Sequence, residues 1–189
     1  MDGKQLRQLK PELITFLDRY LPLFGRDENH QHAQRFVQGL LGGGQERRNT
    51  ENIAEVVEGG VVRTMQKFVA QGVWEDAVVL HEARVHVTET LADERGAINI
   101  DETGFPKKGK KSVGVKRQYS GTLGRVDNCQ IGVFANYYSS KGHTFIDRRI
   151  YLPEEWCQDK PRREEAGIPE NVVFRTKPEL GLEMIRTAV

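Results

Sequence analysis

The sequence has few of the residues and runs that characterise secreted, membrane or thiol-dependent proteins. Only two cysteines occur, Cys129 and Cys157, and they lack CxxC spacing. We interpret both as reduced thiols rather than as a disulfide or a metal site. No apolar run approaches the roughly 20 residues that span a membrane, and the N-terminal MDGKQLRQLKPEL lacks the apolar core of a signal peptide. We therefore expect a cytoplasmic protein, associated with the nucleoid if it binds DNA, with no membrane partner.

Two kinds of catalytic motif are also missing. The five histidines include no HExxH pattern, which argues against a histidine zinc site. No grouping of Ser, His and Asp indicates a hydrolase triad. The composition, with 38% hydrophobic and 29% charged residues, is typical of a globular protein. The 189 residues suffice for one ordinary domain, or for a small domain plus part of a second.

The net charge of +1 conceals one strongly basic stretch. From Thr103 to Val126 the chain contains no Asp or Glu, and its cations are Lys107, Lys108, Lys110, Lys111, Lys116, Arg117 and Arg125. Such a run suits a nucleic-acid backbone, because phosphates attract cations irrespective of base sequence. A solvated basic loop is the alternative.

Apolar residues recur at helical spacing in the N-terminal half of the chain. One expected helix begins at Pro11, a second covers residues 33–41, and a third covers about residues 75–93. Two short apolar segments near residues 50–57 and 61–69 are joined by a glycine turn, which is the outline of a helix-turn-helix. A plain helical hairpin is the alternative. The DNA contacts predicted for this pair are Arg63, Gln66 and Lys67 on its second helix, with Arg47 and Arg48 just upstream.

The pattern then changes from helical spacing to alternation. Three strands are predicted, over residues 97–101, 129–138 and 143–152, with the last two forming a hairpin across Ser139–Gly142. Residues 153–176 are polar and rich in Pro, Glu and Arg, which predicts a long surface loop. A helical pattern resumes at Pro178, and we expect the complete protein to continue beyond Val189.

Asp101 is the candidate catalytic residue, because it stands at the end of an apolar strand where a rigid sheet can hold a carboxylate near a phosphate. Metal-dependent phosphoryl transfer uses two or three such carboxylates, so Asp101 is only part of a site. A turn-forming aspartate is the alternative. Glu102 points to the opposite side of the strand and is assigned a structural or solvent role. A nucleotide-binding P-loop at Gly104–Lys110 is rejected, because Lys111 stands where Ser or Thr must bind magnesium.

Several long strings carry a family resemblance. They are IDETGFPKKGKKSVGVKRQYSGTLGRVDNCQIGVF, RRIYLPEEWCQDKPRREEAGIP, FRTKPELGLEMI and, upstream, GLLGGGQERRNTENIAEVV. Together they cover nearly the whole chain, which resembles bacterial insertion-sequence transposases of the DDE superfamily endonuclease type.

The resemblance implies an RNase H-like core whose first strand carries the first catalytic, metal-binding aspartate, at the position of Asp101. It also implies Mg²⁺ or Mn²⁺ as cofactor, a second aspartate on a strand after the helix near Pro178, and a glutamate on a later helix. The last two lie outside this chain. Asp127, Asp147 and Asp159 fall outside the implied catalytic positions and are interpreted as turn or loop carboxylates.

We therefore predict an α/β (α+β) fold. A helical DNA-binding domain (1–94), with a helix-turn-helix-like pair near 50–70, precedes the first part of an RNase H-like mixed sheet (95–189), truncated at the C-terminus. The predicted function is that of the N-terminal portion of a DDE transposase. It binds double-stranded terminal inverted repeats, as a homo-oligomer or with a full-length transposase, and is inactive in cleavage alone. The alternatives are a non-catalytic DNA-binding regulator of a full-length transposase, or a decayed gene remnant.

Overall fold

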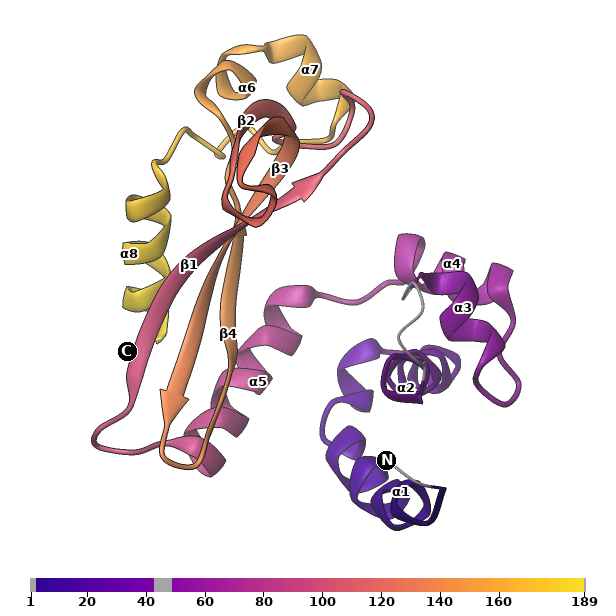
Figure 1. The fold of residues 1–189 in the computed structure, drawn as a ribbon. Helices are drawn as coiled ribbons and strands as arrows, with labels where there is room; N and C mark the ends of the chain where they lie inside the picture. Colours follow the sequence, from indigo (N-terminus) through magenta and orange to yellow (C-terminus); the bar gives the residue numbers. More distant parts are fainter. Residues whose placement is uncertain (1–2, 43–48, 189) are drawn as a thin grey trace. The chain divides into compact units, whose positions relative to one another are not determined.

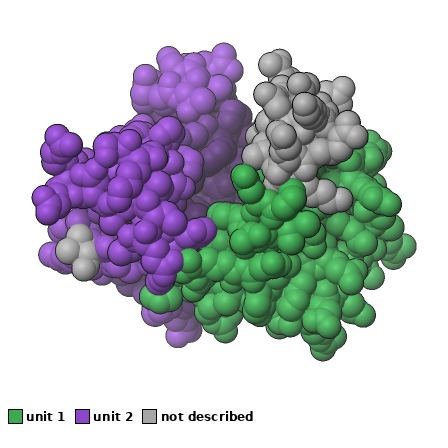
Figure 2. Space-filling model, turned by 90° about the horizontal axis from the view of Figure 1, so that it is seen from below, with its two compact units in different colours: residues 1–82 green, residues 83–189 purple. Residues whose placement is uncertain are grey.

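The computed structural model describes residues 3–42 and 49–188. The chain divides into two compact units, Met1–Glu82 and Ala83–Val189, which Figure 2 shows in green and purple. Helices precede the strands, so the predicted α/β fold with its helical N-terminal part is confirmed. Each helix within the described ranges is too short or too polar to traverse a lipid bilayer.

The first unit is helical (Figure 1). Its elements are α1 (Gly3–Asp18), η1 (Leu21–Phe24), α2 (Asp27–Gly42), α3 (Thr50–Glu55), α4 (Val62–Gln71) and the start of α5 (Asp76–Leu91). Pro11 was expected to open a helix but lies inside α1, where it has no backbone amide to donate to the preceding turn. One hydrophobic cluster in the core of this unit is formed by Ala33, Ala54, Met65 and Phe68.

The predicted pair of short helices with a glycine turn is confirmed as α3 and α4. Asn49 caps α3, its side chain accepting a hydrogen bond of 2.9 Å from the amide of Asn52. In the turn, Gly59 has φ +68°, which favours glycine. A Cβ on Gly60 would lie 2.0 Å from the carbonyl oxygen of Ala54. The two glycines therefore allow the chain to turn tightly between the helices.

The second unit is built on a sheet whose long strand β3 (Arg125–Ser139) pairs with all its neighbours. Those neighbours are β1 (Ala97–Pro106), β2 (Lys116–Ser120) and β4 (Gly142–Ile150), each antiparallel to β3. Cys129 pairs with both Pro106 and Lys116, and Gly132 pairs with both Thr103 and Ile150. Strands β2 and β4 therefore follow each other along the edge of β3 opposite β1.

The three predicted strands and the hairpin closed by Ser139 and Gly142 are confirmed, whereas β2 was not predicted as a strand. Helix α8 (Lys177–Ala188), predicted from Pro178, covers one face of the sheet. Its Leu180 and Met184 are buried against Val133, Ala135 and Ile146, and Val87 of α5 packs on the same cluster.

The segment 153–176, predicted as a surface loop, contains two short helices, α6 (Glu154–Gln158) and α7 (Lys160–Glu165). Such short helices carry too little periodicity to be recognised, and their stability comes from tertiary packing. Here the packing is supplied by Trp156, which is fully buried with Val115 and Leu152. Its indole Nε1 donates a hydrogen bond of 2.8 Å to the carbonyl oxygen of Val115.

Trp156→Phe is therefore expected to lower the free energy of unfolding by about 1–3 kcal/mol, because the ring remains but the buried carbonyl of Val115 loses its donor. Urea denaturation followed by circular dichroism measures this change. An unchanged unfolding midpoint and slope would show that the indole hydrogen bond contributes nothing to stability.

Candidate functional site

Asp101 lies in the middle of β1 rather than at its end. The strand continues for five residues past the predicted boundary, and Asp101 pairs with Phe134 of β3. The alternative of a turn-forming aspartate is thus wrong. The apolar pattern stops at Asp101, and Gly104 and Pro106 are residues that disfavour strands, so no signal in the sequence indicated the extension. Gly104 is required at its position, since a Cβ there would lie 2.4 Å from the hydroxyl oxygen of Ser120 on β2.

The alternation of β1 sends Asp101 and Glu102 to opposite faces of the sheet. Ile98 and Ile100 pack on the core beneath α8. Glu102 shares their face and accepts a hydrogen bond of 2.6 Å from Lys177 Nζ at the start of α8. The structural role predicted for Glu102 fits this ion pair. Asp101 faces the other side of the sheet, away from the core.

The carboxylate of Asp101 is exposed and rigidly placed. Its Oδ1 accepts a hydrogen bond of 2.8 Å from the backbone amide of Glu102. No Lys, Arg or His side chain that the structure describes forms an ion pair with it. A carboxylate that is held by a sheet and left without a cationic partner is available to an external cation.

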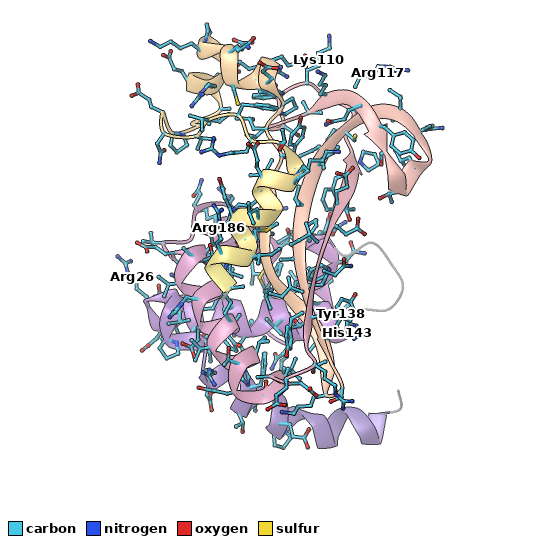
Figure 3. The ribbon with its side chains drawn as sticks, turned by 90° about the vertical axis from the view of Figure 1, so that its left-hand side faces the viewer. Arg26, Lys110, Arg117, Tyr138, His143 and Arg186 are labelled. Atoms are coloured by element: carbon cyan, nitrogen blue, oxygen red, sulfur yellow. The ribbon has the colours of Figure 1, made fainter. Side chains whose placement is uncertain are left out.

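Aromatic rings lie around Asp101 on the same face. Phe134, its cross-strand partner, contacts Phe105 and Phe145, with ring centroids 6.2 and 5.4 Å apart. Further along the hairpin Tyr138 stacks on His143 at 5.3 Å, as Figure 3 shows. Sequence reasoning missed this aromatic surface, because only the strand register brings the rings together.

The cations of the basic segment that begins at the end of β1 fall into two groups, those paired with a carboxylate and those without such a pair. Lys111 forms an ion pair of 2.7 Å with Glu165 of α7, and Lys116 one of 2.9 Å with Glu155 of α6. By contrast, Lys107, Lys108 and Lys110 form no ion pair with any described residue, and Arg117 is exposed. Lys110 and Arg117 lie at the end of the sheet near α6 and α7 (Figures 1 and 3).

The predicted DNA contacts of α4 lie on its outer side. Arg63, Gln66 and Lys67 are exposed, while Met65 and Phe68 of the same helix are buried. No described carboxylate forms an ion pair with Arg63 or Lys67. Arg47 and Arg48 lie outside the described residues.

Comparison with known proteins shows the family to which this chain belongs. The sequence profile described as "DDE superfamily endonuclease" matches residues 19–189. The chain belongs to the DDE superfamily endonuclease family. It is also 32% identical, over 142 residues, to the protein named "Probable transposase for insertion sequence element IS701" of Microchaete diplosiphon. That alignment covers 74% of this chain and 34% of the relative, so the chain spans about a third of the relative's length. No solved structure gave a significant match.

The resemblance to insertion-sequence transposases of the DDE type is thereby confirmed. DDE endonucleases generally depend on divalent metal ions, and transposases bind DNA. In this DDE endonuclease chain, no group of three His, Cys, Asp or Glu side chains that could hold a metal ion occurs among the described residues. Asp101 supplies one carboxylate, and the described residues do not by themselves form a metal site.

Different roles are found for the three aspartates that were interpreted as turn or loop carboxylates, Asp127, Asp147 and Asp159. Asp159 caps α7, accepting a hydrogen bond of 3.1 Å from the amide of Arg162, as a loop carboxylate does. Asp127 was interpreted as a turn or loop carboxylate but lies in β3. There the Asn128 amide and the Arg125 guanidinium, at 2.7 and 2.8 Å, lower its pKa.

The interpretation of Asp147 as a loop carboxylate is wrong. Its side chain is fully buried in β4, where it forms ion pairs with Arg84 of α5 and Arg149. The amide of Arg148 also donates to it, at 2.6 Å. Local sequence could not show this arrangement, because Arg84 lies 63 residues earlier in the chain.

If this chain binds DNA, releasing Lys111 from its ion pair is expected to strengthen that binding. Glu165 raises the pKa of Lys111, and Lys111 lowers the pKa of Glu165, so the pair persists at neutral pH and is lost when acid protonates Glu165 or when alkali deprotonates Lys111. Glu165→Gln should raise affinity for duplex DNA about two- to fivefold and steepen the salt dependence by about one counterion.

Fluorescence anisotropy with labelled duplex DNA measures this effect. Glu164→Gln is the matched control, because it removes the same charge from an exposed neighbour that forms no ion pair with a described residue. Equal effects of the two substitutions would mean that net charge, rather than the release of Lys111, changes the affinity.

Proposed function

We propose that this chain is the N-terminal portion of a DDE transposase and that Asp101 is one of its catalytic, metal-binding carboxylates. The observation that carries the proposal is the placement of Asp101 in a chain of this family. It is exposed in mid-strand, accepts a hydrogen bond from the backbone amide of Glu102, and is free of ion pairs with described side chains. Residues 95–189 are proposed to be the first part of an RNase H-like catalytic domain. In support, β1 pairs with β3 alone among the described strands, so its other edge is open to a further strand.

The metal-binding role needs ligands from elsewhere. Mg²⁺ or Mn²⁺ prefers several oxygen ligands, and Asp101 provides only carboxylate oxygens from one residue. We propose that the remaining carboxylates belong to other parts of a longer transposase, consistent with a relative of which this chain spans 34%. The bound metal would supply electrostatic stabilisation of the phosphoryl group in strand cleavage. Asp101 itself would hold its charge at a fixed point of the sheet.

We propose that DNA is bound by both parts of the chain, in the cytoplasm at the nucleoid. In the helical domain, residues 1–94, the contacts are Arg63, Gln66 and Lys67, with Arg47 and Arg48 upstream. In the basic segment, Lys107, Lys108, Lys110 and Arg117 are the most available cations, and Lys111 and Lys116 contribute when released from their glutamates. The ligand is the double-stranded terminal inverted repeat, bound by a homo-oligomer or together with a full-length transposase.

The second candidate function is a non-catalytic regulator that occupies the same DNA ends. It is favoured by the lack of a metal-holding cluster in the described part of the chain. Both functions predict DNA binding that needs no metal, so binding alone does not separate them. Cleavage by a protein that contains the other carboxylates does.

DNA binding by the chain as it stands tests the shared part of the proposal. Terminal-repeat duplex and a scrambled duplex of equal length are titrated with and without EDTA at increasing salt. We expect preference for the terminal repeat, affinity that falls steeply with salt, and no effect of EDTA. Equal, weak binding to both duplexes would overturn the terminal-repeat assignment. Magnesium-dependent nicking by this chain would overturn the expectation that Asp101 alone is insufficient.

A further inference from the structure

The helical unit contains a pocket that the family comparison does not explain. Its volume is about 530 Å³, within the range of about 300–1,000 Å³ typical of small-ligand sites. Its lining comes from two places in the unit, the turn before α2 with the start of that helix, and one side of α4 with the two residues that follow it. All of these residues lie between Gly25 and Val73, within the first compact unit.

The chain is shaped to form this pocket. Gly25 has φ +78°, a conformation that favours glycine, and it turns the chain from η1 into α2. On the opposite wall Thr64, Lys67 and Gln71 recur at helical spacing along one side of α4. Phe68 lies between the walls, with its ring 5.9 Å from that of His32.

The polar groups of the pocket are mostly donors to an anion. Arg26 and Lys67 form no ion pair with any described residue. Figure 3 shows the Arg26 side chain extending outward, so its guanidinium is open to an arriving ligand. Thr64 and Gln71 add a hydroxyl and an amide donor, and the imidazole of His32 lies on the same lining. Glu28 is the opposing charge, which leaves two cations against one carboxylate.

This set of groups matches a phosphodiester. A guanidinium binds phosphate oxygens in a bidentate manner, a lysine ammonium acts as a point charge, and hydroxyl and amide groups complete the coordination. The pocket also offers the apolar side chains of Phe68 and Val73, and its volume exceeds that of a lone oxyanion. A sugar-phosphate unit therefore fits it better than an isolated ion.

We infer that this pocket binds one phosphate of the DNA backbone, an inference that rests on the proposed DNA-binding function. Phosphate contacts fix the register of a protein on a duplex, whereas base contacts specify the sequence. Lys67 belongs both to the pocket and to the outer side of α4 that carries Arg63 and Gln66. A phosphate held between Arg26 and Lys67 would thus position Arg63 and Gln66 at the base edges.

Arg26→Gln is the main test, because Arg26 is exposed and its loss should not disturb the core. Affinity of the whole chain for terminal-repeat duplex is measured by fluorescence anisotropy across a salt series. We expect a loss of about five- to tenfold and a salt slope smaller by about one. Thr64→Val, which removes the hydroxyl at nearly constant size, should weaken binding in the same direction. Arg186→Gln, an exposed arginine in the last turn of α8, is the matched control and should change neither quantity as much.

The outcomes separate the two proposals. If the wild-type chain does not bind duplex DNA, the proposed function fails and this inference with it. If it binds but Arg26→Gln and Arg186→Gln behave alike, only the phosphate pocket is overturned. An added titration with inorganic phosphate distinguishes the source of the ligand. Binding of free phosphate that is lost in Arg26→Gln, with DNA affinity unchanged, would overturn the assignment to the DNA backbone.

Discussion

Asp101→Asn is expected to lower metal-dependent strand cleavage by about a thousandfold in a transposase that contains this chain and the remaining carboxylates. Asparagine keeps the size of the side chain but removes the negative charge that would bind the cation, and a loss of about 4 kcal/mol of transition-state stabilisation corresponds to this factor. Folding should be unaffected, because the carboxylate is exposed and its hydrogen bond within the described part of the chain is to the backbone amide of Glu102. Cleavage of labelled terminal-repeat DNA in Mg²⁺ measures the rate.

Glu102→Gln is the control for that experiment. Glu102 is the adjacent residue but faces α8, where it pairs with Lys177. Its substitution should cost some stability through the loss of this ion pair and leave cleavage close to the wild-type rate. If Glu102→Gln abolished cleavage and Asp101→Asn did not, the catalytic role would belong to Glu102 and the proposal for Asp101 would be wrong.

Asp147→Ala is expected to destabilise the second unit by about 3–5 kcal/mol. The substitution removes a fully buried carboxylate and leaves Arg84, whose side chain is only 17% exposed, with an uncompensated charge. Because Arg84 also donates a 2.9 Å hydrogen bond to the carbonyl oxygen of Ile146, the disturbance reaches the link between α5 and β4. Urea denaturation followed by intrinsic fluorescence measures the change.

Asp127→Ala serves as the comparison for Asp147→Ala. Asp127 also pairs with an arginine, but at the surface of β3, where solvent screens the interaction. We expect a far smaller change in the unfolding free energy. Equal effects of the two substitutions would show that burial of Asp147 does not govern its contribution.

Local patterns predicted much of the fold. Helical spacing identified α2, the α3–α4 pair and α8, and alternation identified the β3–β4 hairpin, because these elements carry their own periodicity and turn residues. The elements that were missed depend on distant partners. Strand β2 has five residues, and α6 is stabilised by the burial of Trp156 against Val115, so neither has a strong local signal.

The candidate site was predicted less completely, for a similar reason. Asp101 was recognised from its strand and from the family resemblance, but its mid-strand position depends on pairing with β3. The basic segment appeared uncompensated because no acid occurs within it, whereas Glu165 reaches Lys111 from 54 residues away. Arg26 was not predicted as a DNA contact, because a single arginine carries no pattern in the sequence. The turn at Gly25 brings it to the pocket that Lys67 also lines.

The most direct test of the central claim is to sequence the genomic DNA that follows the Val189 codon, together with its flanks. If Asp101 is catalytic, we expect a continuing or frameshifted reading frame that encodes a second aspartate on a strand and a glutamate on a later helix, the whole bounded by inverted repeats. A closed frame with no such sequence would contradict a catalytic role for Asp101 at this locus. The non-catalytic DNA-binding protein would then be the better description.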